Sequence, residues 1–309
     1  MNHNLCTLCP RDCHADRDHG QCGVCGMTND IMIARAVLHM WEEPCISGKN
    51  GSGTVFFVGC PLRCVYCQNV QIAHTGKERG QQNGKEKSIS PKDLAEIFLE
   101  LERKKAENIN LVTPTHYTLQ IIEALKLAKE QGLSVPIVYN CSGYEKAETL
   151  RMLNGLVDIY LTDFKYMDAK LAQRLSHAGD YPEVTKVALK EMVRQCPEAV
   201  FDSDGMMQRG VIVRHLLLPN HVENAKAVVK YVYETYGDQV YLSLMNQYTP
   251  MKQVAENPEL NRCVTKREYD KLLDYALSLG VEHGFIQEGE TAKESFIPPF
   301  DSSENNESL

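Results

Sequence analysis

The segment GCPLRCVYCQN, residues 59–69, carries three cysteines in the spacing C-x3-C-x2-C: Cys60, Cys64 and Cys67. A structural zinc ion commonly takes four protein ligands in two separated pairs, so the triad needs a distant fourth ligand to form such a site. A redox dithiol needs only one C-x2-C pair and leaves Cys60 unexplained. Three thiolates on one short loop suit three corners of an iron–sulfur cubane, with the fourth iron open to a ligand. The residues that could complete a zinc site are Cys45, His74 and Cys141.

A second group of five cysteines lies within the first 25 residues: Cys6, Cys9, Cys13, Cys22 and Cys25. Four of them would complete a zinc site, and C-x2-C pairs are typical of zinc ribbons. A second iron–sulfur cluster that relays electrons is the competing interpretation. Residues 1–26 show little apolar periodicity, so we expect metal binding to order them.

The composition places the chain among ordinary globular proteins. It has 309 residues, 43% hydrophobic and 24% charged, with a formal charge of -8 that argues against a general nucleic-acid binder. The sequence shows neither an apolar stretch of about 18 residues nor an apolar signal-peptide segment, so we expect a cytoplasmic protein without a membrane partner. A reducing cytosol would keep the twelve cysteines free for metal binding.

Six short apolar runs alternate with segments of helical length. The runs predict buried strands at 53–59, 109–114, 135–140, 157–164, 210–219 and 239–245. Amphipathic helices are expected from Ser90, from Thr118 to near Gly132, after Asn220, and from Lys266 to Leu279. Alternation of this kind implies parallel strands with right-handed crossovers. Six such units predict an α/β fold, a partial (β/α)6 TIM-like barrel, with functional residues at the carboxyl ends of the strands.

Three segments follow from this pattern. We expect a small Cys-rich N-terminal module at 1–45, the barrel at 46–300 and a disordered acidic tail at 301–309. The polar stretch at 75–88 is rich in Gly, Gln and Lys, which predicts a mobile loop or a lid over a site.

The triad resembles the C-x3-C-x-aromatic-C motif of the radical S-adenosylmethionine (SAM) superfamily, with Tyr66 at the aromatic position. The surrounding EEPCISGKNGSGTVFFVGCPLRCVYCQN is similar to pyruvate formate-lyase activating enzyme and its relatives, some of which share the leader pattern C-x2-C-P-R-x-C seen at residues 6–13. The resemblance implies a 4Fe-4S cluster on Cys60, Cys64 and Cys67 whose fourth iron binds S-adenosylmethionine. Reductive cleavage of that cofactor would give a 5'-deoxyadenosyl radical that removes a substrate hydrogen.

The fourth predicted strand ends in Asp163-Phe164-Lys165, which resembles the D-x-K pattern of glycyl-radical activating enzymes. The resemblance implies that Asp163 and Lys165 are catalytic and lie near the cofactor. Alternate strand residues point to the same face, so the two side chains can act together. Arg214, in the fifth strand, could hold the carboxylate of the methionine, and an ion pair with Asp163 is the alternative.

The resemblance also implies contacts to the cofactor at other strand ends. Thr113 stands where family members carry a Gly-Gly-Glu-like turn, and Asn140 and Ser142 stand where they carry a segment ending in T-N-G. Asn246 ends the sixth strand and could contact adenine or ribose, although strand capping is an equal alternative. Tyr66 completes the predicted cofactor set.

The leading hypothesis for function is hydrogen abstraction from a glycine of a partner enzyme, with a flavodoxin- or ferredoxin-type protein as the electron donor. A second hypothesis keeps this chemistry and changes the substrate to a small molecule or a peptide side chain. A third, from another class, is a zinc-stabilised binding protein without catalysis. The motifs encode the cofactor chemistry, and the fold alone does not name the substrate.

Overall fold

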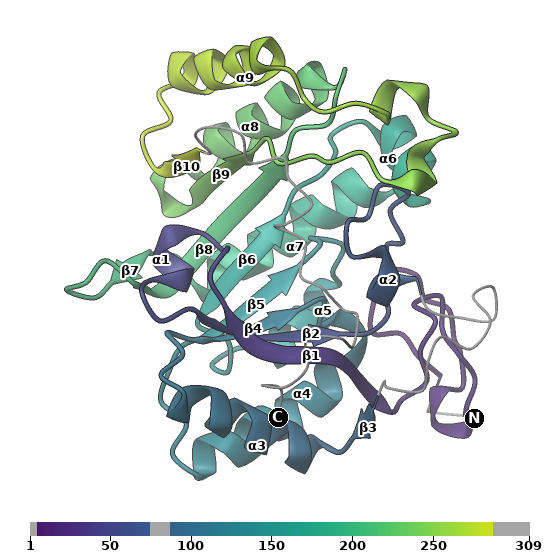
Figure 1. Cartoon of the computed structure of the whole chain (residues 1–309), viewed down its shortest axis with the longest axis vertical. Coiled ribbons are helices and arrows are strands. Elements are labelled where there is room, and N and C mark those ends of the chain that lie inside the picture. Colours follow the sequence, from purple (N-terminus) through teal and green to yellow (C-terminus); the bar gives the residue numbers. More distant parts are fainter. Residues whose placement is uncertain (1–4, 75–86, 287–309) are drawn as a thin grey trace.

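A ten-stranded sheet forms the centre of the structure, a computed structural model that describes residues 5–74 and 87–286. Its six central strands are parallel neighbours, and Figure 1 shows them side by side. They are β2 (Ser52–Phe57), β4 (Ile109–Val112), β5 (Ile137–Cys141), β6 (Ile159–Asp163), β8 (Met207–Leu216) and β9 (Tyr241–Met245). Each coincides with one of the six predicted apolar runs, because strands covered on both faces need apolar side chains throughout.

Three further strands extend the edges of this parallel sheet, and a fourth pairs with an interior strand. β10 (Gly284–Ile286) runs parallel to β9, and β7 (Val200–Phe201) pairs with β8. At the other edge β1 (Ile31–His39) is antiparallel to β2, and β3 (Lys87–Ile89) is antiparallel to β1. The sequence analysis did not predict β1, whose apolar residues are interrupted by Arg35 and are mostly half-buried.

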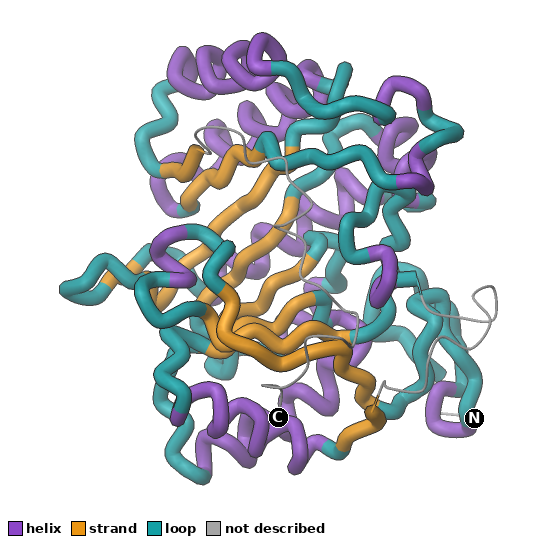
Figure 2. The backbone as a smooth tube through the Cα atoms, in the orientation of Figure 1, coloured by secondary structure: helices purple, strands orange, loops and turns teal. Residues whose placement is uncertain are grey.

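The helices lie between successive strands and cover the sheet. Figure 2 shows this alternation, with α3 and α4 below the sheet and α8 and α9 above it in the view of Figure 1. Ser90 caps α3 in a reciprocal capping box with Asp93, as its sequence predicts. The predicted helices at 118, after 220 and from 266 to 279 are also present. The bounds are α1 (Pro44–Ser47), α2 (Val70–Ala73), α3 (Pro91–Arg103), α4 (Thr118–Glu130), α5 (Ala147–Met152), α6 (Ala169–Ser176), α7 (Tyr181–Gln195), α8 (Val222–Tyr236) and α9 (Lys266–Leu279).

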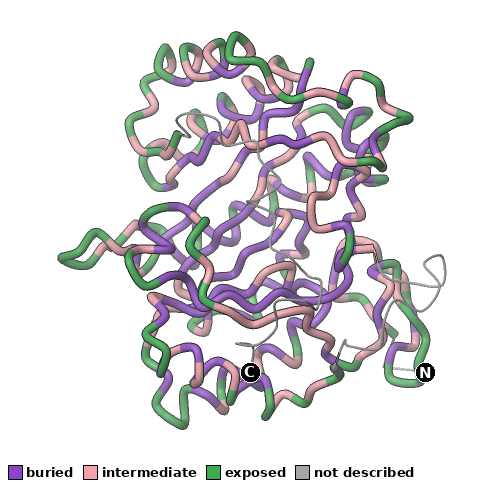
Figure 3. Tube along the Cα trace, viewed as in Figure 1, coloured by how far each residue is buried: buried purple, intermediate pink, exposed green. Residues whose placement is uncertain are grey.

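This arrangement is the predicted partial (β/α)6 TIM-like barrel, and its core has two parts. The larger part lies between the sheet and its helices, and the burial in Figure 3 follows the strands. The smaller part fills the inside of the barrel near the amino ends of the strands, where Cys45 and Ile46 of α1 pack against Val138 and Ile159. Apolar residues therefore close that end of the barrel, and the opposite end is left for a site.

The Cys-rich leader, residues 5–30, packs directly on the loop that carries the cysteine triad. The amide of Cys60 donates a hydrogen bond to the carbonyl of Cys25, at 3.3 Å. Arg17 is buried and donates to the carbonyls of Thr28 and His116. The leader therefore contacts the barrel directly, and the expected ordering by metal stays a prediction.

The predicted segment boundaries are only partly covered by the described residues. The tail at 301–309 and most of the polar stretch at 75–88 lie outside them. β1 falls within the predicted module at 1–45 and yet belongs to the barrel sheet, so the module boundary stays a prediction. Within residues 5–74 and 87–286, no helix combines the length and the apolar character needed to cross a membrane.

Gly59 allows the leader to approach the triad, which gives a first prediction. Its φ is +88°, and an added Cβ would lie 2.3 Å from Cγ of Met27 and 2.8 Å from the carbonyl oxygen of Cys25. We expect Gly59→Ala to lower the free energy of unfolding by about 2–4 kcal/mol through clash and backbone strain. Gly205 has a similar φ of +79° with open space around it, so Gly205→Ala should lose only about 1 kcal/mol. Urea unfolding measures both, and equal losses would contradict the close approach.

Candidate active site

The three cysteines of the triad loop, residues 58–69, line one cavity at the carboxyl end of β2. None of them forms a disulfide. Arg63 adopts a left-handed φ of +56°, and the amide of Cys67 donates to the carbonyl of Cys64 at 3.2 Å. This tight winding turns the side chains of Cys60, Cys64 and Cys67 toward a common space, as the sequence motif requires.

The donor set of the triad loop fits an iron–sulfur cluster. Among residues 5–74 and 87–286, no three His, Cys, Asp or Glu side chains form a group that could hold a single metal ion. A cubane binds each thiolate through a different iron, so its three ligands lie further apart than the ligands of one ion. Burial raises the pKa of all three thiols, and bound iron would supply the positive charge that buried thiolates require.

The fourth-ligand candidates of a zinc site are dispersed. Cys45 is buried in the inner core near the amino ends of the strands. Cys141 donates a hydrogen bond to the hydroxyl of Thr162 and packs as a small core residue. His74 lines the same cavity as the triad. Of the three, only His74 and Cys141 border the cavity, and neither joins the triad in a group that could hold one ion.

The cavity has a volume of about 560 Å³ and extends from the triad loop across the carboxyl ends of the parallel strands. This position is where barrel enzymes of the (β/α) type place their sites. The volume is in the range of pockets that hold a cofactor-sized ligand. Predicted cofactor residues that line it are Tyr66, Thr113, Asn140, Ser142, Asp163, Lys165 and Arg214.

Asp163 is the centre of a buried ion-pair network in this cavity. Its Oδ2 lies 2.5 Å from Nζ of Lys165, and its Oδ1 lies 3.0 Å from Nε of Arg214. Burial alone would raise the pKa of Asp163, but the charges of Lys165 and Arg214 outweigh it and hold the pKa below its ordinary value. Burial would likewise lower the pKa of Lys165, and the Asp163 carboxylate reverses this and raises it. Both groups are therefore charged at neutral pH, and Arg214 forms the ion pair that was one of its two predicted roles.

Glu42 is a site residue that the sequence reasoning did not single out. Its Oε2 lies 3.1 Å from Nη1 of Arg214, and its Oε1 accepts from Asn110 at 3.0 Å and Asn140 at 3.3 Å. Asn140 in turn accepts from Arg214 at 2.6 Å. The available signal was the acidic pair before Pro44 in the segment that resembles activating enzymes. Glu42 lines the cavity and thus connects three strands, β4, β5 and β8, through these contacts.

Glu43, the next residue, is also buried and lines the cavity. Burial raises its pKa, the neighbouring Glu42 adds to the effect, and Arg214 opposes it. A raised pKa favours the neutral acid, which lets Glu43 stay in the protein interior without an ion pair of its own.

Thr113 lies at the carboxyl end of β4 with a φ of +59°. A left-handed conformation is strained for a β-branched residue, and such strain is concentrated at functional sites. The amide of Thr113 donates to the carbonyl of Asn140 at 2.9 Å, which ties the ends of β4 and β5 together. The superfamily that the triad resembles carries a Gly-rich turn at this point. This chain adopts a left-handed backbone there with a threonine instead.

Asn246 is the predicted cofactor residue that the structure does not bring to the cavity. Met245 and Gln247 line the cavity, and Asn246 lies between them without doing so. Successive residues of an extended chain point to opposite faces, so only one of the two sets can face inward. The role of Asn246 as a cofactor residue stays a prediction, and Met245 and Gln247 are the neighbours that line the cavity. Ser142 lines the cavity, and its carbonyl accepts a hydrogen bond from Tyr181.

A chain of buried hydroxyls links the aromatic residue of the motif to a triad cysteine. Tyr166 donates to the hydroxyl of Tyr66 at 2.7 Å and lies 2.7 Å from Oγ of Ser176. Ser176 donates to Sγ of Cys64 at 3.0 Å. Tyr66 therefore positions the loop through its hydroxyl, and Ser176 supplies a hydrogen bond of the kind that tunes a cluster ligand.

Four of the five leader cysteines, Cys6, Cys9, Cys13 and Cys25, lie near one another, and Cys22 is exposed. A methyl group on Gly23 would lie 3.2 Å from Sγ of Cys13 and 3.4 Å from Sγ of Cys25. Burial raises the pKa of Cys9 to about 12, and the charges of Cys25 and Cys6 contribute. The predicted leader metal, zinc or a second cluster, stays a prediction: within residues 5–74 and 87–286, no three leader side chains are grouped closely enough to hold a single ion.

Arg11 of the leader connects the triad loop to α6. Its guanidinium donates to the carbonyls of Pro61 at 2.8 Å, Leu62 at 3.2 Å and Ser176 at 2.9 Å, and also to that of His177. Five donors in a fixed fork suit Arg to this role. The leader therefore fixes the backbone between Cys60 and Cys64.

Residues 54–206 match the model of the Radical SAM superfamily. The chain carries a radical SAM domain. Membership in the superfamily implies a 4Fe-4S cluster and S-adenosylmethionine as cofactors, and the triad loop with its cavity fits both.

Relatives of this radical SAM protein are distant. An uncharacterised protein of Methanocaldococcus jannaschii is 29% identical over 273 residues, which cover 88% of this chain and 74% of the relative. A second protein of that organism, named as a candidate glycyl-radical enzyme activating enzyme, is 29% identical over 145 residues, 46% of this chain and 55% of its own length. SuiB of Streptococcus suis, solved bound to S-adenosylmethionine, is 16% identical over 74% of this chain and 48% of its own, with a TM-score of 0.47. The chain thus spans about half the length of the latter two.

The contacts of Glu42 give the second prediction. Glu42→Leu would leave Arg214, Asn110 and Asn140 with unpaired donors inside the barrel. We expect a loss of about 3–5 kcal/mol in the free energy of unfolding, the effect of breaking a buried ion pair. Glu107 accepts two hydrogen bonds from Asn50 nearer the surface, so Glu107→Leu is the matched control and should lose under about 1 kcal/mol. Urea unfolding of the two variants compares them, and a similar small loss in both would show that Glu42 does not hold the network.

Proposed function

We propose that this protein is a radical SAM enzyme of the glycyl-radical activating type. The observation that carries the proposal is that Cys60, Cys64 and Cys67 open on the same cavity as the Asp163, Lys165 and Arg214 network. When bound there, the cluster and S-adenosylmethionine would supply one-electron cleavage of a carbon–sulfur bond and removal of a substrate hydrogen.

The protein's own residues would bind and orient the ligands. The three thiolates would hold the cluster and leave one iron open, and Ser176 would keep its hydrogen bond to Cys64. Lys165 and Arg214 would present positive charge to the ligand carboxylate, with Asp163 fixing the position of both. Thr113, Asn140 and Ser142, which line the cavity at the strand ends, would contact the cofactor.

The proposed substrate is a glycine of a partner enzyme, and the proposed electron donor is a protein of the flavodoxin or ferredoxin type. The D-x-K pattern at Asp163 and Lys165 supports the activating type, as does the name of the second M. jannaschii relative. A cytoplasmic location is part of the same proposal, since this chemistry needs reduced donors. The experiments below distinguish this substrate from the two alternatives, a small molecule and a peptide side chain.

The cofactor assignment gives the third prediction. Protein purified without oxygen should be brown, contain iron and sulfide, and form 5'-deoxyadenosine from S-adenosylmethionine on reduction with dithionite. Cys60→Ala should lose the iron–sulfur absorption and the 5'-deoxyadenosine, because two thiolates cannot hold a site-differentiated cubane. Cys263 is exposed and outside the cavity, so Cys263→Ala should keep both. A colourless protein with one zinc per chain would defeat the proposal in favour of a zinc-stabilised binding protein.

The substrate assignment gives the fourth prediction. Reduced protein, S-adenosylmethionine and a glycyl-radical enzyme encoded near this gene should together yield the electron paramagnetic resonance doublet of a glycyl radical. The same partner with its radical glycine changed to alanine is the control and should give no doublet. If 5'-deoxyadenosine forms steadily on another substrate while no doublet develops, the activating role is wrong and the radical SAM chemistry stands.

A further inference from the structure

A second hollow of about 390 Å³ lies on the outer side of the triad loop. It is bordered by the leader, the triad loop and the end of α6, and its lining residues are Arg11, Val24, Arg63, Val65, His74 and His177. Arg63 and His74 line both this hollow and the cofactor cavity. The triad loop is therefore the wall between the two spaces.

The lining of this outer hollow is cationic, in contrast to the chain as a whole. The two charged side chains among its described lining residues are Arg11 and Arg63, and no carboxylate of residues 5–74 and 87–286 lines it, although the chain has a formal charge of -8. The four hydrogen bonds of Arg11 go to backbone carbonyls, so its charge is not neutralised by them. Asp12, the next residue, is paired with Lys146. The hollow is thus a local positive site on a negative protein.

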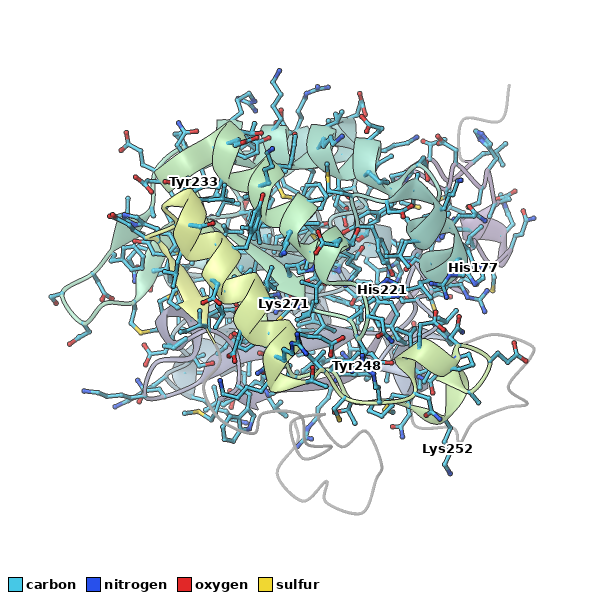
Figure 4. The ribbon with its side chains drawn as sticks, turned by 90° about the horizontal axis from the view of Figure 1, so that it is seen from above. His177, His221, Tyr233, Tyr248, Lys252 and Lys271 are labelled. Atoms are coloured by element: carbon cyan, nitrogen blue, oxygen red, sulfur yellow. The ribbon has the colours of Figure 1, made fainter. Side chains whose placement is uncertain are left out.

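Apolar contact is available beside the charges. Val24 of the leader is 39% exposed, and Val65 of the triad loop is half-buried at the same hollow. Figure 4 shows His177 near the edge of the molecule, away from Lys271 of α9. A small apolar centre with a charged rim is the composition of a transient protein interface.

We propose that this outer hollow is the docking surface for an acidic electron-donor protein, an inference that rests on the proposed radical SAM function. Val65 and Arg63 lie between ligand cysteines in the sequence, so a donor seated here is separated from the triad by the thickness of one loop. The docked donor would lose one electron and the triad's cluster would gain it, without transfer of atoms. Like charge elsewhere on the surface disfavours other orientations of an acidic partner.

Two lining residues outside the cofactor cavity allow a specific test. Val24→Glu adds negative charge at the apolar centre, and His177→Asp adds it at the rim. Aspartate is chosen because His177 has a left-handed φ of +52°, which Asp tolerates better than most residues. The control is Val200→Glu with Lys271→Glu, which changes the total charge more but lies on β7 and α9, far from the leader in Figure 1.

The first readout is binding, which does not depend on catalysis. The full-length reconstituted protein would be immobilised without oxygen, and the affinity of an acidic flavodoxin measured by interferometry. We expect the Val24→Glu/His177→Asp variant to bind about tenfold more weakly, while the control binds as the wild type does. Added salt should weaken the wild type more than the variant, because exposed charges are screened. Equal affinity of variant and wild type would overturn the proposal.

The second readout separates docking from chemistry. With dithionite as the reductant, the variant should form 5'-deoxyadenosine at the wild-type rate, and with reduced flavodoxin its rate should fall about tenfold. A fall with both reductants would mean that the changes damage the site, which contradicts docking. If the wild type forms no 5'-deoxyadenosine with dithionite, the proposed function fails and the binding result still decides the docking surface. Saturable binding of inorganic phosphate, with flavodoxin affinity unchanged in the variant, would make the hollow a small-anion site instead.

Discussion

The buried ion pair between Arg214 and Asp163 is the interaction on which the rest of the site depends. Both side chains come from central strands of the sheet and face the inside of the barrel, where an unpaired charge is strongly unfavourable. Each must therefore find an opposite charge within the interior. Lys165 meets this need from the loop that follows β6, and Glu42 meets it from the segment between β1 and α1. The register of β6 against β8 places Asp163 beside Arg214, and the segment before α1 places Glu42 beside Arg214. Both positions satisfy the same requirement, the pairing of buried charges.

The leader stabilises the shape of the triad loop. A loop that must present three thiols to one space has few backbone hydrogen bonds of its own. Arg11 supplies these bonds from outside, and the carbonyl of Cys25 accepts the amide of Cys60. The close contact at Gly59 allows this approach. The leader is thus a structural part of the cofactor site, whatever its cysteines bind.

Local patterns in the sequence were sufficient to predict the six parallel strands, the start of α3 at Ser90 and the shared orientation of Asp163 and Lys165. Each of these follows from residues that are close in sequence, through burial, capping or alternation. Glu42 and Arg11 were missed because their partners are remote: Glu42 contacts Arg214, and Arg11 contacts Ser176. The sequence did not decide between Asn246 and its neighbours Met245 and Gln247 at the cavity, since alternation fixes which residues share a face but not which face turns inward. Strand β1 was missed because its residues are mostly half-buried and Arg35 interrupts its apolar run, and because it follows the Cys-rich leader.

The charges of the cavity also constrain how it can receive a ligand. Glu42 and Asp163 balance Lys165 and Arg214, while burial favours the neutral form of Glu43, so the network has no surplus charge before a ligand enters. A ligand carboxylate that binds Lys165 or Arg214 must therefore share them with protein carboxylates already in place. Lys165 is the easier to share, because its flexible ammonium carries three donors and bonds, among the described residues, to Asp163 alone. Arg214, in contrast, is fixed by Asp163, Glu42 and Asn140. On this argument Arg214 holds the network together, and Lys165 is the cation that meets the ligand.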